Sequence, residues 1–413
     1  MKFYKIFSLL IVAMAIAGTA NAQVTSSPYS KIGYGILSDN ASGIQRSMGG
    51  VGYAMQDGRA INVMNPASYS QVDSLTFIWD VGLDATYLMS KEGTKKGDSF
   101  GGGLDYLKGQ FKIAKRLGGS FGLLPYSSVG YSFGNTLGSG SEYHEGSGGL
   151  LQLYVGAGYE LFKGLSVGAN GSYMFGTISN INSLTTSSNT LFLREMQVRD
   201  YNVNVGIQYA YDLDKDSRIV VGATFTPKKS FHGNTWGLYY DNQDAKADTV
   251  GMTKLNGKFE QPNTFGVGLS YNYKKQFLAE VDFTYQDWAK AKYTPIAGFE
   301  AKDTKFNNRW KAAAGVQYTP NKRGSYLGVM KFRVGGFYNN DYMNIAGNSV
   351  KDYGVSAGVG LPVPGVTGKT TLNLGIEWKR RQASPQKLIQ EDYLSFTVGI
   401  NVNEVWFWKN KIR

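Results

Sequence analysis

The sequence predicts an all-β protein: a 14-stranded antiparallel transmembrane β-barrel of the bacterial outer membrane with an N-terminal hatch segment inside its lumen. Three observations predict this fold. An export signal begins the chain, and long segments alternate between apolar and polar side chains in a two-residue period. The connections between these segments alternate between short and long, as in outer-membrane barrels.

The composition excludes several other classes of protein. The 413 residues include 53 Gly and 28 Tyr, and only 18% are charged, against about 25% in soluble globular domains. Because there is no cysteine, disulfides, thiolate nucleophiles and zinc–thiolate sites are excluded. His144 and His232 alone cannot form a multi-histidine metal site, and they fall in different predicted loops without a hydrolase motif. We therefore expect no enzyme, no metal and no cofactor.

Residues 1–22 have the form of a secretory signal peptide. Lys2 and Lys5 precede the apolar run IFSLLIVAMAIA, and Ala20-Asn21-Ala22 supplies the small residues that signal peptidase recognises. A transmembrane anchor is the alternative, but the apolar run is short and a cleavage site follows it. We expect an exported protein of the outer membrane. Its formal charge of +12 then suits membrane lipid and lipopolysaccharide phosphates as partners, and not nucleic acid.

The next elements are strands. Residues 75–87, LTFIWDVGLDATY, place apolar side chains from Leu75 to Tyr87 on one face and mostly polar ones on the other. Fourteen such segments occur, at about 75–87, 104–115, 119–134, 150–161, 165–177, 199–212, 217–227, 263–274, 276–288, 308–319, 327–339, 352–361, 370–381 and 392–406. They predict a barrel over residues 75–407, followed by a short tail at 408–413. Even-numbered strands end in tight turns, whereas odd-numbered ones precede longer segments such as 178–198 and 228–262.

Alternation alone does not distinguish a lipid-facing wall from the core of a soluble periplasmic sandwich. Many strands reach the 9 to 11 residues needed to cross a bilayer at a tilt. Aromatic residues, Tyr131 and Phe133 among them, lie toward the ends of the apolar rows, as in interfacial girdles. The opposite rows hold charges in mid-strand. These features favour lipid around the apolar face, and a wall in lipid must close on itself.

Residues 23–74 are rich in Ser, Gly and Asn and lack strong alternation. A 14-stranded lumen is too wide for wall side chains to fill, so we expect this segment to plug it. Arg46 and Arg59 are then expected to form ion pairs with wall carboxylates, for which the candidates are Asp80, Asp84, Asp282 and Glu377. A flexible periplasmic extension is the alternative.

Several motifs resemble one known family. Arg46-Ser47-Met48-Gly49-Gly50 followed by Asn65-Pro66-Ala67 resembles the hatch of the FadL family of outer-membrane transporters for long-chain fatty acids and hydrocarbons. The segments EVDFTYQDW, at 280–288, and YGVSAGVGLP, at 353–362, resemble later strands of that family. The resemblance spans most of the mature chain and implies a 14-stranded barrel with an internal hatch whose motif residues are Met48, Gly49, Gly50, Asn65, Pro66 and Ala67.

Pro125 lies in the middle of the third predicted strand. Because proline cannot donate to a strand ladder and a closed barrel has no edge, it predicts a local break in the wall. The outward row of this strand is predicted to run from Phe121 to Phe133. FadL-like transporters have a kink in the third strand that opens the wall toward the membrane, and the matching residues here are Pro125, Tyr126, Ser127 and Ser128. A bulge that only adjusts curvature is the alternative.

The function expected from the resemblance is passive transport of hydrophobic small molecules, with hatch gating and lateral exit near Pro125. Apolar residues in polar loops are candidates for ligand contact: Leu191, Phe192, Leu193, Phe231, Trp236 and Leu238. The second possibility is a non-transporting barrel that serves a protein secretion or outer-membrane assembly complex, as the PorV-like members of the FadL family do in Bacteroidota. A continuous apolar tunnel would favour transport, and a lumen sealed by hatch ion pairs would favour the complex subunit.

Overall fold

The computed structural model describes residues 26–186, 189–241, 246–294, 305–321, 324–363 and 370–405. The predicted signal peptide and the predicted tail lie outside these residues. Helices in the described part have at most six residues, and none has the length and apolar character that crossing a bilayer demands.

The wall is a closed antiparallel barrel of fourteen strands, as predicted. Closure comes from pairing of the last strand with the first, from Gln390 opposite Lys91 to Val405 opposite Thr76. The strands are β2 (Thr76–Glu92), β3 (Lys95–Ala114), β4 (Leu117–Leu137), β5 (Gly140–Phe162), β6 (Leu165–Thr185), β7 (Asn189–Asp212), β8 (Ser217–Thr226), β13 (Thr264–Tyr273), β14 (Phe277–Gln286), β15 (Arg309–Tyr318), β16 (Lys331–Ile345), β17 (Asn348–Pro362), β18 (Thr371–Ser384) and β19 (Gln390–Val405).

The expected long connections are partly strand. Residues 178–198, predicted as a connection, belong mostly to β6 and β7, which continue their pairing as far as Thr185 opposite Asn189. Residues 228–262 contain β9 (Lys229–Ser230), β10 (Gly233–Asp241), β11 (Lys246–Lys254) and β12 (Glu260–Gln261). Beyond the membrane a strand has no lipid on one side, so its sequence need not alternate and the pattern ends before the strand does.

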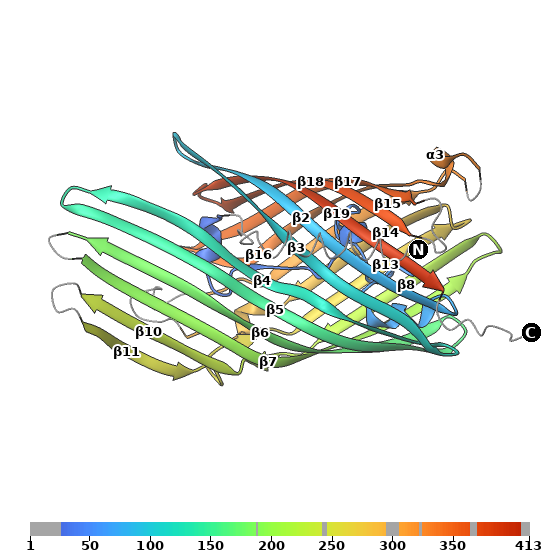
Figure 1. Ribbon diagram of the computed structural model, residues 1–413, viewed down its shortest axis with the longest axis horizontal. Helices are drawn as coiled ribbons and strands as arrows, with labels where there is room; N and C mark the ends of the chain where they lie inside the picture. The colour runs from blue at the N-terminus through green and yellow to red at the C-terminus, as the bar shows by residue number, and fades with distance from the viewer. Residues whose placement is uncertain are drawn as a thin grey trace, which may run out of the picture.

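The wall is therefore uneven in height. The strands β4 to β7 have 21 to 24 residues, whereas β8, β13, β14 and β15 have 10 each, about the length that crosses a bilayer at a tilt. The outer half of β7 pairs with β10 where β8 has already ended. Figure 1 shows β4 to β7 and the hairpin β10–β11 projecting together at the end opposite the arrowhead of β19.

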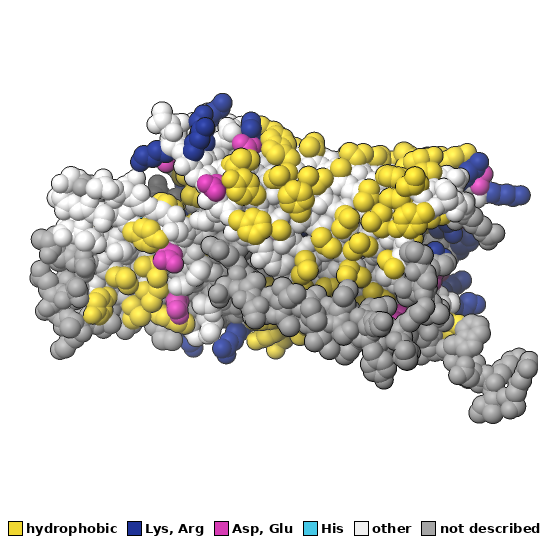
Figure 2. Space-filling view, turned by 45° about the horizontal axis from the view of Figure 1, so that its top comes forward, with side chains coloured by type: hydrophobic (Ala, Val, Ile, Leu, Met, Phe, Trp, Pro, Cys, Tyr) yellow, Lys and Arg dark blue, Asp and Glu magenta, His cyan; other side chains and the backbone are white. Residues whose placement is uncertain are grey.

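Apolar side chains face outward and charged ones face the lumen, as the alternation predicts. Exposed fractions reach 68% at Val155 and 52% at Val281, whereas Asp80 and Lys108 are 0% and 1% exposed. Figure 2 shows apolar side chains over the wall, with Lys and Arg mainly toward its two ends. An apolar face without protein cover indicates a lipid surface, so the soluble sandwich is excluded.

Residues 26–74, called the hatch from here on, lie inside the barrel. They contain η1 (Pro28–Lys31), β1 (Ile36–Leu37), α2 (Gly43–Arg46) and η2 (Pro66–Gln71). Most of their side chains are buried against the inner wall, including Tyr34, Met48 and Ala67 at 0% exposure.

Wall glycines let the hatch backbone approach the strands. An added Cβ at Gly335 would lie 2.1 Å from the carbonyl carbon of Met48, and one at Gly222 would lie 1.9 Å from the carbonyl oxygen of Tyr53. Any side chain at these places would occupy the position of the hatch. This glycine girdle comprises Gly118, Gly158, Gly168, Gly206, Gly222, Gly315 and Gly335. It explains in part why the chain contains so much glycine.

Candidate functional site

The wall separates between β3 and β4. Their pairing runs from Ala114 opposite Leu117 to Leu107 opposite Leu123 and ends there. Outward of this point β3 pairs only with β2, and β4 pairs with β5. The two edges that do not pair with each other, Lys95–Tyr106 and Leu124–Leu137, define what we call the seam.

Two β-bulges flank the start of the seam. On β4 the register with β5 shifts between Pro125 and Ser127, so Tyr126 is the additional residue. On β3 the register with β2 shifts at Leu83, so Asp105 is the additional residue. A bulge bends its strand and strengthens its twist. Because one bulge lies on each side of the seam, both strands bend at the height where their pairing ends.

The bulge at Tyr126 also reverses which face of β4 points into the lumen. Pro125 lies opposite the outward Leu151, but Ser127 lies opposite Leu150, which is fully buried. The predicted outward row is therefore wrong after Pro125. Tyr131 is 2% exposed and packs in the lumen, together with the partly buried Phe133, and neither belongs to a lipid-facing girdle there. One additional residue moves every following side chain to the other face.

The hatch occupies part of the freed edge of β4. In β1, Ile36 pairs with Ser128 and Leu37 pairs with Ser127. The Ser38 N–H donates to the Tyr126 carbonyl at 2.9 Å. Residues Pro125 to Ser128, singled out from the sequence, thus lie at the seam and contact the hatch.

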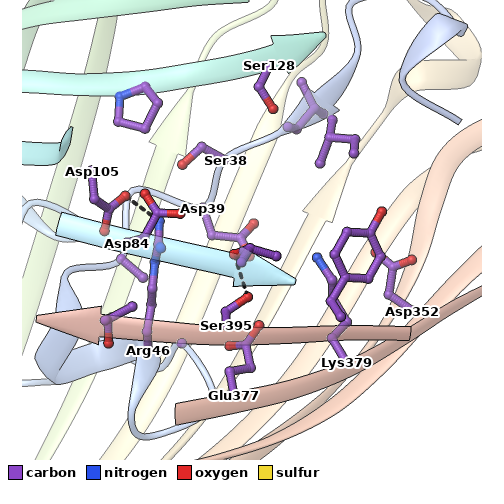
Figure 3. A pocket seen from close by; sticks show the side chains of 18 of the residues that line it. Ser38, Asp39, Arg46, Asp84, Asp105, Ser128, Asp352, Glu377, Lys379 and Ser395 are labelled. Carbon is purple, nitrogen blue, oxygen red and sulfur yellow. Dashed lines mark hydrogen bonds and ion pairs between the residues drawn. The ribbon is translucent and has the colours of Figure 1, made fainter. Parts of the chain in front are cut away.

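A chamber of about 380 Å³ lies behind the seam. Its lining comes from both seam edges, from the hatch and from the opposite wall, and it combines charged side chains with apolar surface. Figure 3 shows Arg46, Asp84 and Asp105 at one side and Lys379 and Asp352 at the other. Charged side chains on its lining are Asp39, Arg46, Asp84, Asp105, Arg309, Lys311, Asp341, Asp352, Glu377, Lys379 and Arg381.

Two sets of ion pairs fasten the hatch to this chamber. Arg46 in α2 contacts the bulged Asp105 at 2.6 Å. Asp39 bridges two cations of β15, with 2.5 Å to Arg309 and 2.7 Å to Lys311. Burial by itself raises the pKa of the Asp39 carboxyl, but the Lys311 ammonium and the Arg309 guanidinium outweigh it and hold that pKa well below its usual range.

We expect Asp39→Asn to loosen the hatch strand over the seam. In the parent protein, amide hydrogen exchange of residues 36–40, corrected for intrinsic rates, should stay constant from pH 8 to pH 5. A lowered folded-state pKa gives stability that is complete above the unfolded value of about 3.9 and is lost only as the pH falls through the lower folded value. Asp39→Asn should raise the exchange rate at least five-fold at every pH in this range. Asp73→Asn, which removes an exposed partner of Arg59, should leave it unchanged, and equal rates in both variants would contradict the assignment.

The predicted ion-pair residues do not converge as expected. Arg59 pairs at 3.0 Å with Asp73 of the hatch itself, because both lie at the exposed end of the segment. Asp80 pairs at 3.2 Å with Lys108, its direct neighbour on β3, and not with the hatch. Asp84 and Glu377 line the chamber.

Asp282 does hold the hatch, but through backbone groups. Its Oδ2 accepts from the N–H groups of Gly52 and Tyr53 at 2.6 and 3.0 Å. Glu280, two residues earlier on the same face of β14, accepts from the Ala54 N–H at 2.8 Å. Three consecutive amides thus converge on two wall carboxylates, where the sequence predicted an arginine contact.

The Met48-Gly49-Gly50 motif forms the turn after α2. Gly49 and Gly50 have φ of +75° and +84°, a region that other residues rarely adopt. The Gly49 N–H donates to the hydroxyl of Ser356 at 2.9 Å, and Met48 lies against the glycine girdle.

The Asn65-Pro66-Ala67 motif begins η2. The Asn65 side chain accepts from the Ala67 N–H at 3.1 Å as an N-cap, and it donates to the Tyr53 carbonyl at 2.8 Å. Pro66 occupies the first turn, where its missing N–H costs nothing. Both motifs thus shape the contact between hatch and wall.

A dense aromatic cluster fills the outer lumen. Tyr34 of the hatch packs on Phe231 at 5.1 Å and on Trp288 at 5.6 Å between ring centroids, and Trp288 stacks on Tyr342 at 4.6 Å. These four side chains are 0 to 1% exposed. Other buried members come from the hatch, the outer connections and the wall, among them Tyr29, Tyr131, Leu150, Met174, Met196, Phe259 and Phe306.

The predicted ligand residues are divided between two places. Phe231 belongs to the aromatic cluster. Leu191, Phe192 and Leu193 lie on β7, and Trp236 and Leu238 lie on the paired β10, in the part of the wall that rises beyond β8. Phe192 packs on Tyr239 at 4.9 Å between centroids. The latter five therefore belong to the projecting sheet and not to the lumen cluster.

Several residues of the site were not predicted. They include Asp39, Arg309, Lys311, Asp341, Asp352, Arg381 and the aromatic residues Tyr34, Trp288 and Tyr342. One signal was available for a single pair, because Asp352 lies directly opposite Arg381 in the β17–β18 ladder. The others depend on how the hatch lies within the wall.

Comparison with solved structures identifies the same fold in proteins of very different sequence. The toluene transporter TodX of P. putida is 14% identical, with a TM-score of 0.64 over 90% of this chain and 100% of that one. The CymD monoaromatic hydrocarbon channel is 15% identical, with a TM-score of 0.60 over 88% and 98% of the two chains. A Pseudomonas aeruginosa FadL homologue is 10% identical, with a TM-score of 0.61 over 90% and 99%.

The first two are named a transporter and a channel and the third a FadL homologue, and the TM-scores of all three show that this chain has the same fold. No curated protein matches the chain. The model of one protein family, BamG, matches residues 3–413. The chain therefore belongs to the BamG family.

Proposed function

We propose that this chain is a non-conducting outer-membrane barrel that acts as a subunit or partner of a membrane protein complex, of the kind that serves protein secretion or outer-membrane assembly. The observation that carries the proposal is the filled lumen. The aromatic cluster occupies its outer half, and the hatch packs on the glycine girdle below it.

The energy of opening such a lumen argues against conduction. Exposing Tyr34, Trp288 and Tyr342 uncovers about 150 to 250 Å² each, which at about 25 cal/mol per Å² costs on the order of 10 kcal/mol or more. At about 1.4 kcal/mol per factor of ten, a spontaneously open state is then rarer than roughly one in ten million. The chamber beneath the cluster is lined by charges, which a hydrocarbon cannot solvate.

We expect the purified protein to be silent in planar bilayers and to bring protein partners with it. Gentle detergent extraction from the native membrane, followed by mass spectrometry, should recover at least one partner at a stoichiometry near 1:1. Reconstituted barrel should add no steady conductance above the bare membrane. Steady channels, or a barrel purified alone under several mild detergents, would contradict the proposal.

One observation favours a second candidate, the passive transport of hydrophobic small molecules with lateral exit near Pro125. The seam interrupts the wall at membrane depth, and the chamber reaches it. A double variant, Leu37→Cys with Ser127→Cys, distinguishes the two functions. These residues lie opposite each other in the β1–β4 ladder, so the two cysteines can form a disulfide. If the seam is an exit, oxidation should abolish cellular uptake of a labelled long-chain fatty acid and reduction should restore it. A complex subunit would show no such uptake in either state.

A further inference from the structure

The chamber behind the seam contains polar groups that the protein itself leaves unpartnered. Arg381 is 2% exposed, yet its Nη1 has no hydrogen-bond partner among the described residues. The same holds for Oδ2 of Asp105, which is 6% exposed, and for the Ser127 hydroxyl, which is 4% exposed. A buried polar atom without a partner costs about 1 to 3 kcal/mol. These three atoms therefore indicate a polar guest in the chamber.

Charges of both signs in the chamber also lack ion pairs. Lys379 lies over the ring of Tyr393, with 4.2 Å from its Nζ to the ring centroid, and no carboxylate of the described chain lies within ion-pair distance. Asp84 and Glu377 line the same space, and within the described part of the chain neither has a cation at that distance. A guest that carries one positive and one negative group would satisfy both sets.

The seam provides a route from this chamber to the hydrocarbon of the membrane. Its edges at the chamber are Gly102, Gly103 and Leu104 of β3 and Pro125 of β4, and Leu104 is 46% exposed on the outer surface. The glycines contribute no side chain, and Ile36 and Leu37 of the hatch supply apolar surface beside them. Unpaired strand edges at membrane depth are tolerated only where protein or a polar cavity satisfies them. A polar head within the chamber and an acyl chain along the seam meet both requirements.

We propose that the chamber binds the zwitterionic head group of a glycerophospholipid of the phosphatidylethanolamine type. The lipid comes from the surrounding membrane, and one of its acyl chains lies in the seam. The chamber volume of about 380 Å³ admits a head group but not a whole lipid. Its donors are Arg381, Lys379 and Ser127, and its acceptors are Asp105, Asp84 and Glu377. The inference does not depend on the proposed function, since a lipid held at the seam is compatible with either a complex subunit or a transporter.

Native mass spectrometry of the full-length mature protein released from nanodiscs tests the proposal. Equal amounts of phosphatidylethanolamine, phosphatidylglycerol and diacylglycerol are supplied, and free phosphoethanolamine is added in a separate arm. We expect one phosphatidylethanolamine per barrel, retained at least ten-fold over the other two lipids, and no retention of free phosphoethanolamine. Equal retention of all lipids, preference for phosphatidylglycerol, or binding of the free head group alone would overturn the proposal.

Two variants link the lipid to the chamber. Lys379→Met removes an ammonium that has no ion-pair partner in the described chain, so it should leave the barrel folded and reduce retention at least ten-fold. Arg380→Met is the matched control, because Arg380 pairs with Asp392 at 2.7 Å and does not line the chamber. Retention that is the same in both variants and the parent would overturn the assignment. If Lys379→Met fails to fold, Glu377→Gln serves as the second test with the same expected loss.

Discussion

Gly335→Val should displace the hatch turn at Met48 and Gly49 from the wall and make Arg46 accessible to trypsin. The new Cβ would lie 2.1 Å from the Met48 carbonyl carbon and 2.4 Å from the Gly49 nitrogen, and both are backbone atoms that cannot rotate away. Overpacking of this kind typically costs about 1 to 3 kcal/mol, which raises the population of a displaced hatch by roughly 5-fold to 150-fold. The rate of cleavage after Arg46, followed by mass spectrometry on the detergent-solubilised barrel, should rise by the same factor when opening precedes cleavage.

The control for this experiment is Gly171→Val on β6. A Cβ there meets no atom within 4 Å, and the position faces outward. It should leave cleavage after Arg46 at the parental rate. If Gly335→Val is cleaved no faster than Gly171→Val, the girdle does not hold the hatch and the filled-lumen argument fails with it.

Arg381→Met is expected to be the most destabilising single substitution on the inner wall. Arg381 is 2% exposed and contacts Asp352 through two hydrogen bonds of 2.7 and 2.8 Å, with Asp341 at 3.3 Å. Removing the guanidinium takes the ion-pair partner from two buried carboxylates. Breaking a buried pair in this way costs about 3 to 5 kcal/mol. The free energy of unfolding, measured by urea titration of the barrel in lipid or detergent, should fall by that amount.

The adjacent residue provides a matched comparison. Arg380 also contacts a carboxylate through two hydrogen bonds, to Asp392 at 2.7 and 3.1 Å, but its side chain is 32% exposed. Arg380→Met should therefore cost no more than about 1 kcal/mol. Adding Asp341→Asn and Asp352→Asn to Arg381→Met should recover most of the loss, since neutral amides need no cation. Equal losses in the two single variants would show that burial does not decide the effect.

The sequence predicted the number of strands and, except for β4 beyond Pro125, the direction of their apolar faces. These features depend on local pattern, because lipid on one side and a polar lumen on the other require a two-residue period in every strand. The second bulge, at Asp105, was not predicted. It lies between Leu104 and Tyr106, after three glycines that interrupt the alternation of apolar and polar residues. A shift of one residue in the strand register therefore cannot be seen in the sequence pattern.

The reversal of β4 shows the limit of such reasoning. Val129 and Tyr131 continue an apolar row after Pro125, and a lumen filled with aromatic residues accepts them as readily as lipid does. Alternation identifies a face but not its environment once both sides are apolar. The ion pairs of Arg46 and Asp39 depend on the path of the hatch through the lumen, which no local spacing encodes.

The close packing of the hatch on the wall glycines also bears on the order in which the molecule assembles. Backbone of the hatch that packs as closely on the wall as it does at Gly222 and Gly335 has little room to slide along the lumen once β19 has paired with β2. We therefore expect residues 26–74 to be in place while the wall is still an open sheet, and the wall to close around them. Any machinery that inserts this protein into the membrane would then have to protect an intermediate whose wall is still open and already contains residues 26–74. Pairing of β19 with β2 would be the last step.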